Sequence, residues 1–175
     1  MPMMLNQRPS SPIKMPNVDL IFDSPLWGKS KLGCRTLVPS LIDLAWNNVP
    51  KRPKDIEPEI CVTLSDDPSL RILNRNHRQK NKPTNVLSFP DWESMDDMPS
   101  GIGDIPIGDI VVAFETVKRE ALEQNKPFKD HFSHIIIHGF LHLLGYDHIF
   151  DAQAEEMEAL EVKILKKLDI PNPYI

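Results

Sequence analysis

Cysteine and long hydrophobic runs are both scarce in this sequence of 175 residues. The two cysteines, Cys34 and Cys61, form neither a CxxC pair nor a disulfide framework, which favours two free thiols in a reducing compartment. The longest uncharged run, which includes residues 135–141, is interrupted by His138 and His142 and ends before Asp147, so it is too short and too polar to span a bilayer. The first residues contain no apolar segment typical of a signal peptide. We therefore expect a cytoplasmic protein that makes no contact with a membrane.

The rest of the composition is ordinary, with 41% hydrophobic and 26% charged residues, which excludes wholesale disorder and a fibrous structure. Proline is the exception, because five of the 17 prolines lie within the first 25 residues. We expect residues 1–16 to form an irregular, Pro-rich N-terminus. The length of the remainder predicts one domain over residues 17–175.

The formal net charge of −5 is unevenly distributed along the chain. Residues 91–175 carry 7 basic and 17 acidic side chains, whereas residues 68–90 carry five basic side chains and no acidic one. This basic strip favours contact with a polyanion such as a nucleic-acid backbone. The alternative, which composition alone favours, is a solvated helix face followed by a charged loop. The strip consists of Arg71, Arg75, Arg78, Lys80 and Lys82.

Hydrophobic periodicity predicts strands that alternate with helices, without a repeat or a linker. Four short β-branched or apolar segments predict strands at residues 18–22, 60–64, 85–89 and 107–113. Helical spacing predicts helices at residues 36–48, after Pro68, at residues 115–125 and 129–144, and after Asp151. The predicted fold class is α/β (α+β), a single domain with a mixed sheet of about four strands packed with four or five helices. Residues 91–106 are expected to form an acidic loop.

Four of the six histidines fall within 15 residues, on and just after the central predicted helix, 129–144. His138 and His142 are four residues apart, the spacing at which HExxH proteins present two nitrogens to one metal. His134 extends the same row, but it lies eight residues, or about 12 Å, from His142 and cannot bind the same ion as both others. A metal would therefore use either His134 and His138 or His138 and His142.

Gly145 favours the second pair, because a left-handed cap at this glycine would turn the chain back and return His148 to the end of the helix. His138, His142 and His148 then form a three-nitrogen site with one coordination position open for water, which is the catalytic arrangement. His134 is then expected to support the site from one turn away, or to be a core residue. The alternative for all of them, histidines satisfied within the core, is less consistent with this spacing.

The glutamate that acts as general base in HExxH proteases is missing, since Gly139 follows the first histidine. A glycine at this position allows backbone or substrate to approach closely. Asp147, beside His148, is a candidate base or a support for the ligands, and an equally good turn former. The sequence therefore argues against peptide hydrolysis by the usual zinc-protease route.

Residues 138–148, HGFLHLLGYDH, resemble the signature of the YbeY family of bacterial endoribonucleases. Two further segments agree with this resemblance: Leu73-Asn74 with Arg78 and residues 82–90, KPTNVLSFP, and also residues 108–112. The similarity extends over roughly residues 60–168. One departure is His77, where the family more often has an aromatic residue such as tyrosine, although histidine can also stack on a base.

The resemblance implies one zinc ion per chain, bound by His138, His142 and His148. It also implies a single-strand-specific endoribonuclease in ribosomal RNA maturation, notably at the 3′ end of the small-subunit RNA, and in ribosome quality control. The expected partners are single-stranded RNA, the ribosomal small subunit and its assembly factors. The family's functionally important arginine corresponds to Arg78.

Two functional hypotheses follow. In the first, the protein is an RNA hydrolase in which zinc polarises a phosphoryl oxygen or activates a water, while Arg78 neutralises charge that develops on the phosphate. The other basic side chains, Arg71, Arg75, Lys80 and Lys82, would contact the substrate. In the second, the protein is a ribosome-associated assembly factor with a mainly structural metal site and weak or partner-dependent hydrolase activity. The open coordination position favours the first hypothesis. The lack of an obvious carboxylate base is consistent with the second, which therefore stays open.

Overall fold

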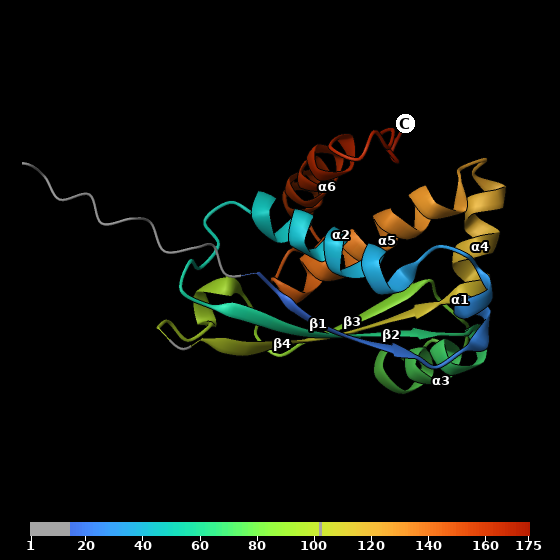
Figure 1. Ribbon diagram of the computed structural model, residues 1–175, viewed down its shortest axis with the longest axis horizontal. Coiled ribbons are helices and arrows are strands. Elements are labelled where there is room, and N and C mark those ends of the chain that lie inside the picture. Colours follow the sequence, from blue (N-terminus) through green and yellow to red (C-terminus); the bar gives the residue numbers. More distant parts are fainter. Residues whose placement is uncertain (1–14, 102) are drawn as a thin grey trace, which may run out of the picture.

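A computed structural model describes residues 15–101 and 103–175 of the chain. They form a single α/β domain around one four-stranded mixed sheet with the strand order β1-β2-β4-β3 (Figure 1). Strands β1, β2 and β4 are parallel, and β3 runs antiparallel to β4 at one edge. The strands are β1 (Asn17–Phe22), β2 (Glu57–Ser65), β3 (Val86–Pro90) and β4 (Asp104–Ala113).

Six α-helices surround the sheet unequally. Figure 1 shows α2 and α5 over one face with α6 above them, and α3 against the opposite face. The helices are α1 (Pro25–Lys29), α2 (Cys34–Asn48), α3 (Asp67–Arg78), α4 (Phe114–Glu123), α5 (Phe128–Leu143) and α6 (Asp151–Lys166), with a short 3-10 helix η1 (Met95–Asp97). Helix α5 is the central one, because most of its residues are buried between the sheet and the other helices.

The predicted fold class is confirmed, and each of the four strands and five helices expected from periodicity is present. The additional helix, α1, has only five residues, too few to show periodicity; it begins after Ser24, whose side chain accepts a hydrogen bond from the Leu26 backbone amide. Strands β2 and β4 begin three residues earlier than expected, at Glu57 and Asp104. Pro58 and Pro106 lie near the start of these strands, beside a bulge in the β2–β4 pairing, and residues 104–106 of the expected acidic loop are therefore part of β4.

Three other expectations concern termini, thiols and membranes. Most of the expected irregular N-terminus, residues 1–14, lies outside the described residues, so the domain boundary at residue 17 stays a prediction. Cys34 is buried, Cys61 is half-buried, and both are free thiols. Within the described part of the chain, no helix combines the length and the apolar character needed to cross a membrane.

Gly139 allows α5 to lie very close to the sheet. A Cβ atom on this residue would stand 3.1 Å from Val86 Cγ2 and 3.2 Å from Ile110 Cγ2, which is tighter than ordinary packing. The Ser88 hydroxyl donates a 2.8 Å hydrogen bond to the Gly139 carbonyl oxygen, so strand β3 holds the helix at this point. The glycine that stands in place of the protease glutamate therefore faces the sheet, and its close approach is to side chains of β3 and β4.

We expect Gly139→Val to lower the free energy of unfolding by about 1–3 kcal/mol, because the added methyl groups overpack the helix–sheet contact. Urea denaturation of the metal-free protein measures this loss. Gly28→Val is the matched control, since a Cβ atom at Gly28 meets nothing within 4 Å. Equal losses in the two variants would contradict the proposed close contact.

Candidate metal centre and its cleft

Helix α5 ends in a tight left-handed turn that redirects the chain. Gly145 has a φ of 91°, its amide donates to the His142 carbonyl, and the Tyr146 amide donates to the Leu141 carbonyl. These two bonds form a Schellman motif, which requires a residue with positive φ at this position. Glycine is needed for a second reason, because a Cβ atom there would lie 2.7 Å from the carbonyl oxygen of Glu93.

The turn brings His148 back to the end of α5, as its sequence position predicted. His138, His142 and His148 each offer a ring nitrogen, and the three nitrogens lie within 4.8 Å of one another. The Nε2 atoms of His138 and His142 are 3.1 Å apart. Two nitrogens bound tetrahedrally to one zinc at about 2.1 Å are about 3.4 Å apart, so this pair has the spacing that a shared ion requires.

His142 is suited to bind a cation because its imidazole is neutral. Burial, followed by the nearby imidazoles of His138 and His148, lowers its pKa from 6.5 to about 4. A lowered pKa means that the ring is unprotonated at every pH well above 4. A nitrogen lone pair is therefore available for a metal throughout the physiological range.

His134 lies one turn earlier on α5, outside the three-histidine group. With His138 and Glu161 it forms a second set of potential ligands whose atoms also lie within 4.8 Å. However, His138 Nδ1 and Glu161 Oε1 are only 2.6 Å apart, which suits a hydrogen bond and is too close for two ligands of one zinc. The geometry therefore favours a metal between His138, His142 and His148, with Glu161 behind His138.

Glu161 is a functional candidate that the sequence analysis missed. Its side chain on α6 is completely buried. Burial alone would raise the pKa of this carboxyl, but the nearby imidazoles of His134 and His138, the second of them hydrogen-bonded to it, lower it to about 2. Its position in the sequence could have indicated this role. Glu161 shares a helical face with the core residues Met157, Ile164 and Leu165, and a carboxylate on such a face needs a buried hydrogen-bond partner.

The three histidines line one wall of a cleft of about 590 Å³, and Arg78 lines the same cleft. Arg78 is exposed at the last residue of α3, and no hydrogen bond or ion pair within residues 15–101 and 103–175 engages its guanidinium. The cleft thus joins the end of α3, strand β3 and the α5–α6 connection. Its other lining residues are Thr84, Asn85, Val86, Ser88, Pro90, Trp92, Glu93, Gly145, Tyr146, Asp147 and Ile149.

The remaining basic residues do not line the histidine cleft. Arg71 and Arg75 line a separate hollow of about 470 Å³, where Arg71 Nε donates to Asn81 Oδ1 at 3.0 Å. Lys80 and Lys82 are both exposed in the loop after α3. The structure therefore places Arg78 in the cleft with the histidines, whereas the other four basic residues do not line it and their contact with substrate stays a prediction.

Asp147 lies in the cleft beside the histidines and also forms the turn. Its Oδ1 accepts a 2.7 Å hydrogen bond from the His148 backbone amide, which is the turn-forming role that the sequence allowed. Trp92 and Glu93 bring the acidic 91–106 segment into the same cleft, and the Trp92 indole donates to the Pro106 carbonyl at 2.8 Å. This segment is therefore part of the cleft wall.

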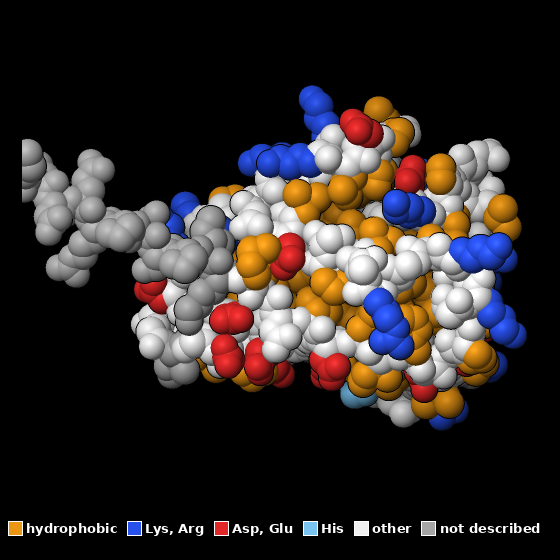
Figure 2. All heavy atoms as spheres, in the orientation of Figure 1, with side chains coloured by type: hydrophobic (Ala, Val, Ile, Leu, Met, Phe, Trp, Pro, Cys, Tyr) orange, Lys and Arg blue, Asp and Glu red, His pale blue; other side chains and the backbone are white. Residues whose placement is uncertain are grey.

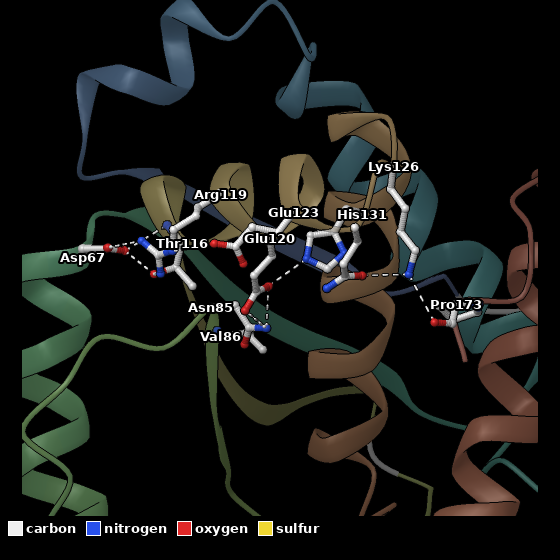
Figure 3. Close-up of polar contacts among 11 residues, drawn as sticks. Asp67, Asn85, Val86, Thr116, Arg119, Glu120, Glu123, Lys126, His131 and Pro173 are labelled. Atoms are coloured by element: carbon white, nitrogen blue, oxygen red, sulfur yellow. Dashed lines mark hydrogen bonds and ion pairs between the residues drawn. The ribbon is translucent and has the colours of Figure 1, made fainter. Parts of the chain in front are cut away.

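A buried polar network fixes Asn85 in the cleft wall (Figure 3). Asn85 Nδ2 donates to both carboxylate oxygens of Glu120, at 3.0 and 3.2 Å, and His131 Nε2 lies 2.8 Å from Glu120 Oε2. Burial would raise the pKa of Glu120, but the bonds from His131 and Asn85 lower it below its ordinary value. The network links the residue just before β3 with α4 and α5, and no motif in the sequence indicated it.

Acidic side chains gather on another part of the surface. Figure 2 shows several of them over the end of the sheet where the parallel strands begin. A hollow in this region is lined by four carboxylates, those of Asp19, Glu59, Asp91 and Asp109. A polyanion is repelled from such a surface, so the cleft with Arg78 is the more favourable place for one.

Comparison with known proteins gives consistent results. A family model described as "Endoribonuclease YbeY" matches residues 31–169. The chain is 46% identical over 168 residues to an endoribonuclease YbeY of Bradyrhizobium sp. strain BTAi1, covering 95% of each chain. It is 42% identical over 165 residues to the protein of that name from Nitrobacter hamburgensis, covering 91% of this chain and 83% of the relative. The solution structure of TM1509 from Thermotoga maritima is similar, with a TM-score of 0.57, 25% identity and coverage of 86% and 88% of the two chains.

We expect the protein to bind about one zinc ion per chain and His142→Ala to lose most of it, because two imidazoles cannot complete the three-nitrogen set. His134→Ala is the matched control on the same helix and should keep most of the metal. Elemental analysis after dialysis against buffer measures both. Full occupancy in His142→Ala, or a loss confined to His134→Ala, would show that the ion uses the other group.

Proposed function

The chain belongs to the YbeY endoribonuclease family, and from this membership we propose that it is a zinc-dependent endoribonuclease specific for single-stranded RNA. We further propose that it acts in the cytoplasm on ribosomal RNA, at the 3′ end of the small-subunit RNA and in ribosome quality control. Its partners are then the ribosomal small subunit and its assembly factors.

One observation carries the proposal: three imidazoles at metal-binding spacing share a cleft with Arg78, whose guanidinium has no partner among the described residues. The donor set fits zinc, because neutral imidazole nitrogens are typical zinc ligands and three protein ligands leave a position for water or substrate. His138, His142 and His148 would hold the ion. Bound zinc supplies a Lewis acid and lowers the pKa of a coordinated water toward 7.

Arg78 is the proposed catalytic residue of this chain. Its guanidinium can bind two phosphate oxygens at once and neutralise charge that develops on them during cleavage. The exposed position at the end of α3 lets it reach a phosphate in the cleft. Asn85, by contrast, is held by its bond to Glu120, so its main role in the proposal is to shape the cleft wall.

The substrate path follows from the distribution of charge. Arg71, Arg75, Lys80 and Lys82 lie on or just after α3, which ends at the cleft, and they would contact successive phosphates of a strand that enters there. A flexible single strand can bend from the hollow beside α3 into the cleft. A rigid duplex would also meet the carboxylates at the opposite end of the sheet.

A second function has one observation in its favour. Within the described residues the cleft has only two carboxylates, Glu93 and Asp147, and Asp147 is engaged by the backbone of His148. A hydrolase that needs a carboxylate base near its metal would then have only Glu93 without a hydrogen bond to the described residues. A ribosome-associated assembly factor, with a mainly structural metal and weak or partner-dependent activity, is the corresponding alternative.

We expect Arg78→Ala to reduce the rate of cleavage of a labelled single-stranded RNA by several hundredfold. This factor corresponds to the loss of about 3–4 kcal/mol of transition-state stabilisation, which is typical of one positioned donor. Its melting temperature should change little, since exposed charges contribute about 0–1 kcal/mol to folding. Arg35→Ala, another exposed arginine but on α2, is the activity control. If the metal-loaded wild-type protein does not cleave RNA, or if Arg78→Ala activity simply follows its folded fraction, the catalytic role is wrong.

We expect the protein to bind single-stranded RNA more tightly than a duplex of the same sequence, with a strong dependence on salt. Replacing Arg71, Arg75 and Lys80 together by glutamine should reduce the slope of log K against log salt by about 2, because about 0.7 counterions are released per phosphate contact. Titration of labelled RNA across a salt series measures this. Equal or tighter duplex binding, or an unchanged slope, would place the RNA elsewhere.

A further inference from the structure

Glu161 is a completely buried carboxylate with three polar neighbours from two other parts of the chain. Its Oε1 lies 2.6 Å from His138 Nδ1, and its Oε2 lies 3.6 Å from His134 Nε2. The Tyr174 hydroxyl donates to Oε2. A buried ionised carboxylate is costly unless its oxygens accept hydrogen bonds, and here each oxygen has a partner.

The bond to His138 determines which ring nitrogen can bind a metal. Glu161 Oε1 lies 2.6 Å from His138 Nδ1, and a carboxylate oxygen accepts hydrogen bonds, so Nδ1 is the ring nitrogen that carries the proton and donates it to Glu161. The neutral ring then has its lone pair on Nε2, the atom that lies 3.1 Å from His142 Nε2 at the cleft. Without this partner the imidazole could protonate either nitrogen, and only one of the two tautomers could bind the ion.

Residues 167–175, which follow α6, reach back to this carboxylate through Tyr174. The segment is attached to the loop between α4 and α5, because Lys126 Nζ donates to the Pro173 carbonyl at 3.2 Å (Figure 3). The Tyr174 ring packs edge-on against His134 with centroids 5.7 Å apart. Burial, then the charge and hydrogen bond of Glu161, raise the pKa of the Tyr174 hydroxyl, which therefore stays protonated and donates.

Occupation of Oε2 has a second consequence. His134, His138 and Glu161 are the other potential ligand group, and it shares His138 with the three-histidine group. A carboxylate that is free to rotate could turn toward a metal. With Tyr174 on Oε2 and His138 on Oε1, both oxygens are committed, so the carboxylate stays behind the imidazole.

We propose that Glu161 is a positioning residue that holds His138 in the metal-binding tautomer, and that Tyr174 keeps Glu161 in this role. The inference rests on the three-histidine metal centre of the proposed function. It adds that the affinity of this centre for metal depends on α6 and on residues 167–175, neither of which supplies a ligand.

The first test reads the tautomer directly. Imidazole ¹⁵N shifts of the metal-free protein, at a pH where the rings are neutral, should show His138 protonated at Nδ1 in the wild type. Glu161→Gln should give a mixture of tautomers at His138, because a neutral amide is a weaker acceptor than a carboxylate. Glu155→Gln is the matched control, since it removes the same charge from an exposed position on α6. An unchanged His138 in Glu161→Gln overturns the proposal.

The second test measures zinc affinity by competition with a chromogenic chelator. Glu161→Gln should weaken binding by about 10–100-fold, the usual effect of removing a carboxylate behind a ligating histidine. Tyr174→Phe keeps the ring and should cause a smaller loss in the same direction, while Glu155→Gln keeps wild-type affinity. Wild-type affinity in both Glu161→Gln and Tyr174→Phe overturns the proposal.

Two further measurements separate the explanations. If Glu161→Gln alters the visible absorption of the cobalt-loaded protein as the loss of a ligand does, Glu161 coordinates the metal and the positioning role is wrong. If Glu161→Gln fails to fold, as judged by melting of the metal-free protein, Tyr174→Phe decides the question because it leaves the carboxylate in place. If the wild type binds no zinc, the proposed metal centre fails, and the imidazole shifts still test the role of Glu161.

Discussion

The contact between α5 and the sheet at Gly139 is the constraint on which the candidate site depends. It sets the height of the helix above β3 and β4, and the Ser88 hydroxyl fixes the helix backbone there. His138 and His142 lie on either side of this contact in sequence, so their positions relative to the cleft wall follow from it. The same helix meets α6 through His134 and His138. Helix α5 therefore packs one face against the sheet and presents its histidines on another face, toward the cleft and α6.

Features that depend on one stretch of chain could be predicted from the sequence. The spacing of His138 and His142 and the left-handed turn at Gly145 are local, and they were sufficient to bring His148 into the group. The basic strip shows the limit of such reasoning. Arg71 and Arg78 share a helix face by periodicity, but seven residues correspond to about 10 Å along the axis, and only Arg78 reaches the cleft.

Features that depend on packing between distant elements could not be predicted. Glu161 contacts His138 only when α6 lies on α5. In the same way, Asn85, Glu120 and His131 meet only when the start of β3, α4 and α5 come together. The 91–106 segment is similar. Its composition predicted an irregular loop, but its contribution to the cleft wall depends on the approach of Glu93 to Gly145, two positions more than fifty residues apart.

The sheet order has a consequence for how the chain is made. Each parallel pairing, β1 with β2 and β2 with β4, joins segments about forty or more residues apart, with helices between them. During synthesis from the N-terminus, β2 can acquire its central neighbour only after Ala113 has emerged, and long-range pairings of this kind form slowly. The histidines of α5, then His148, Glu161 and Tyr174 follow in that order. All four strands are therefore synthesised before any residue of the candidate metal centre, and the three histidines come together against a sheet whose strands have already emerged.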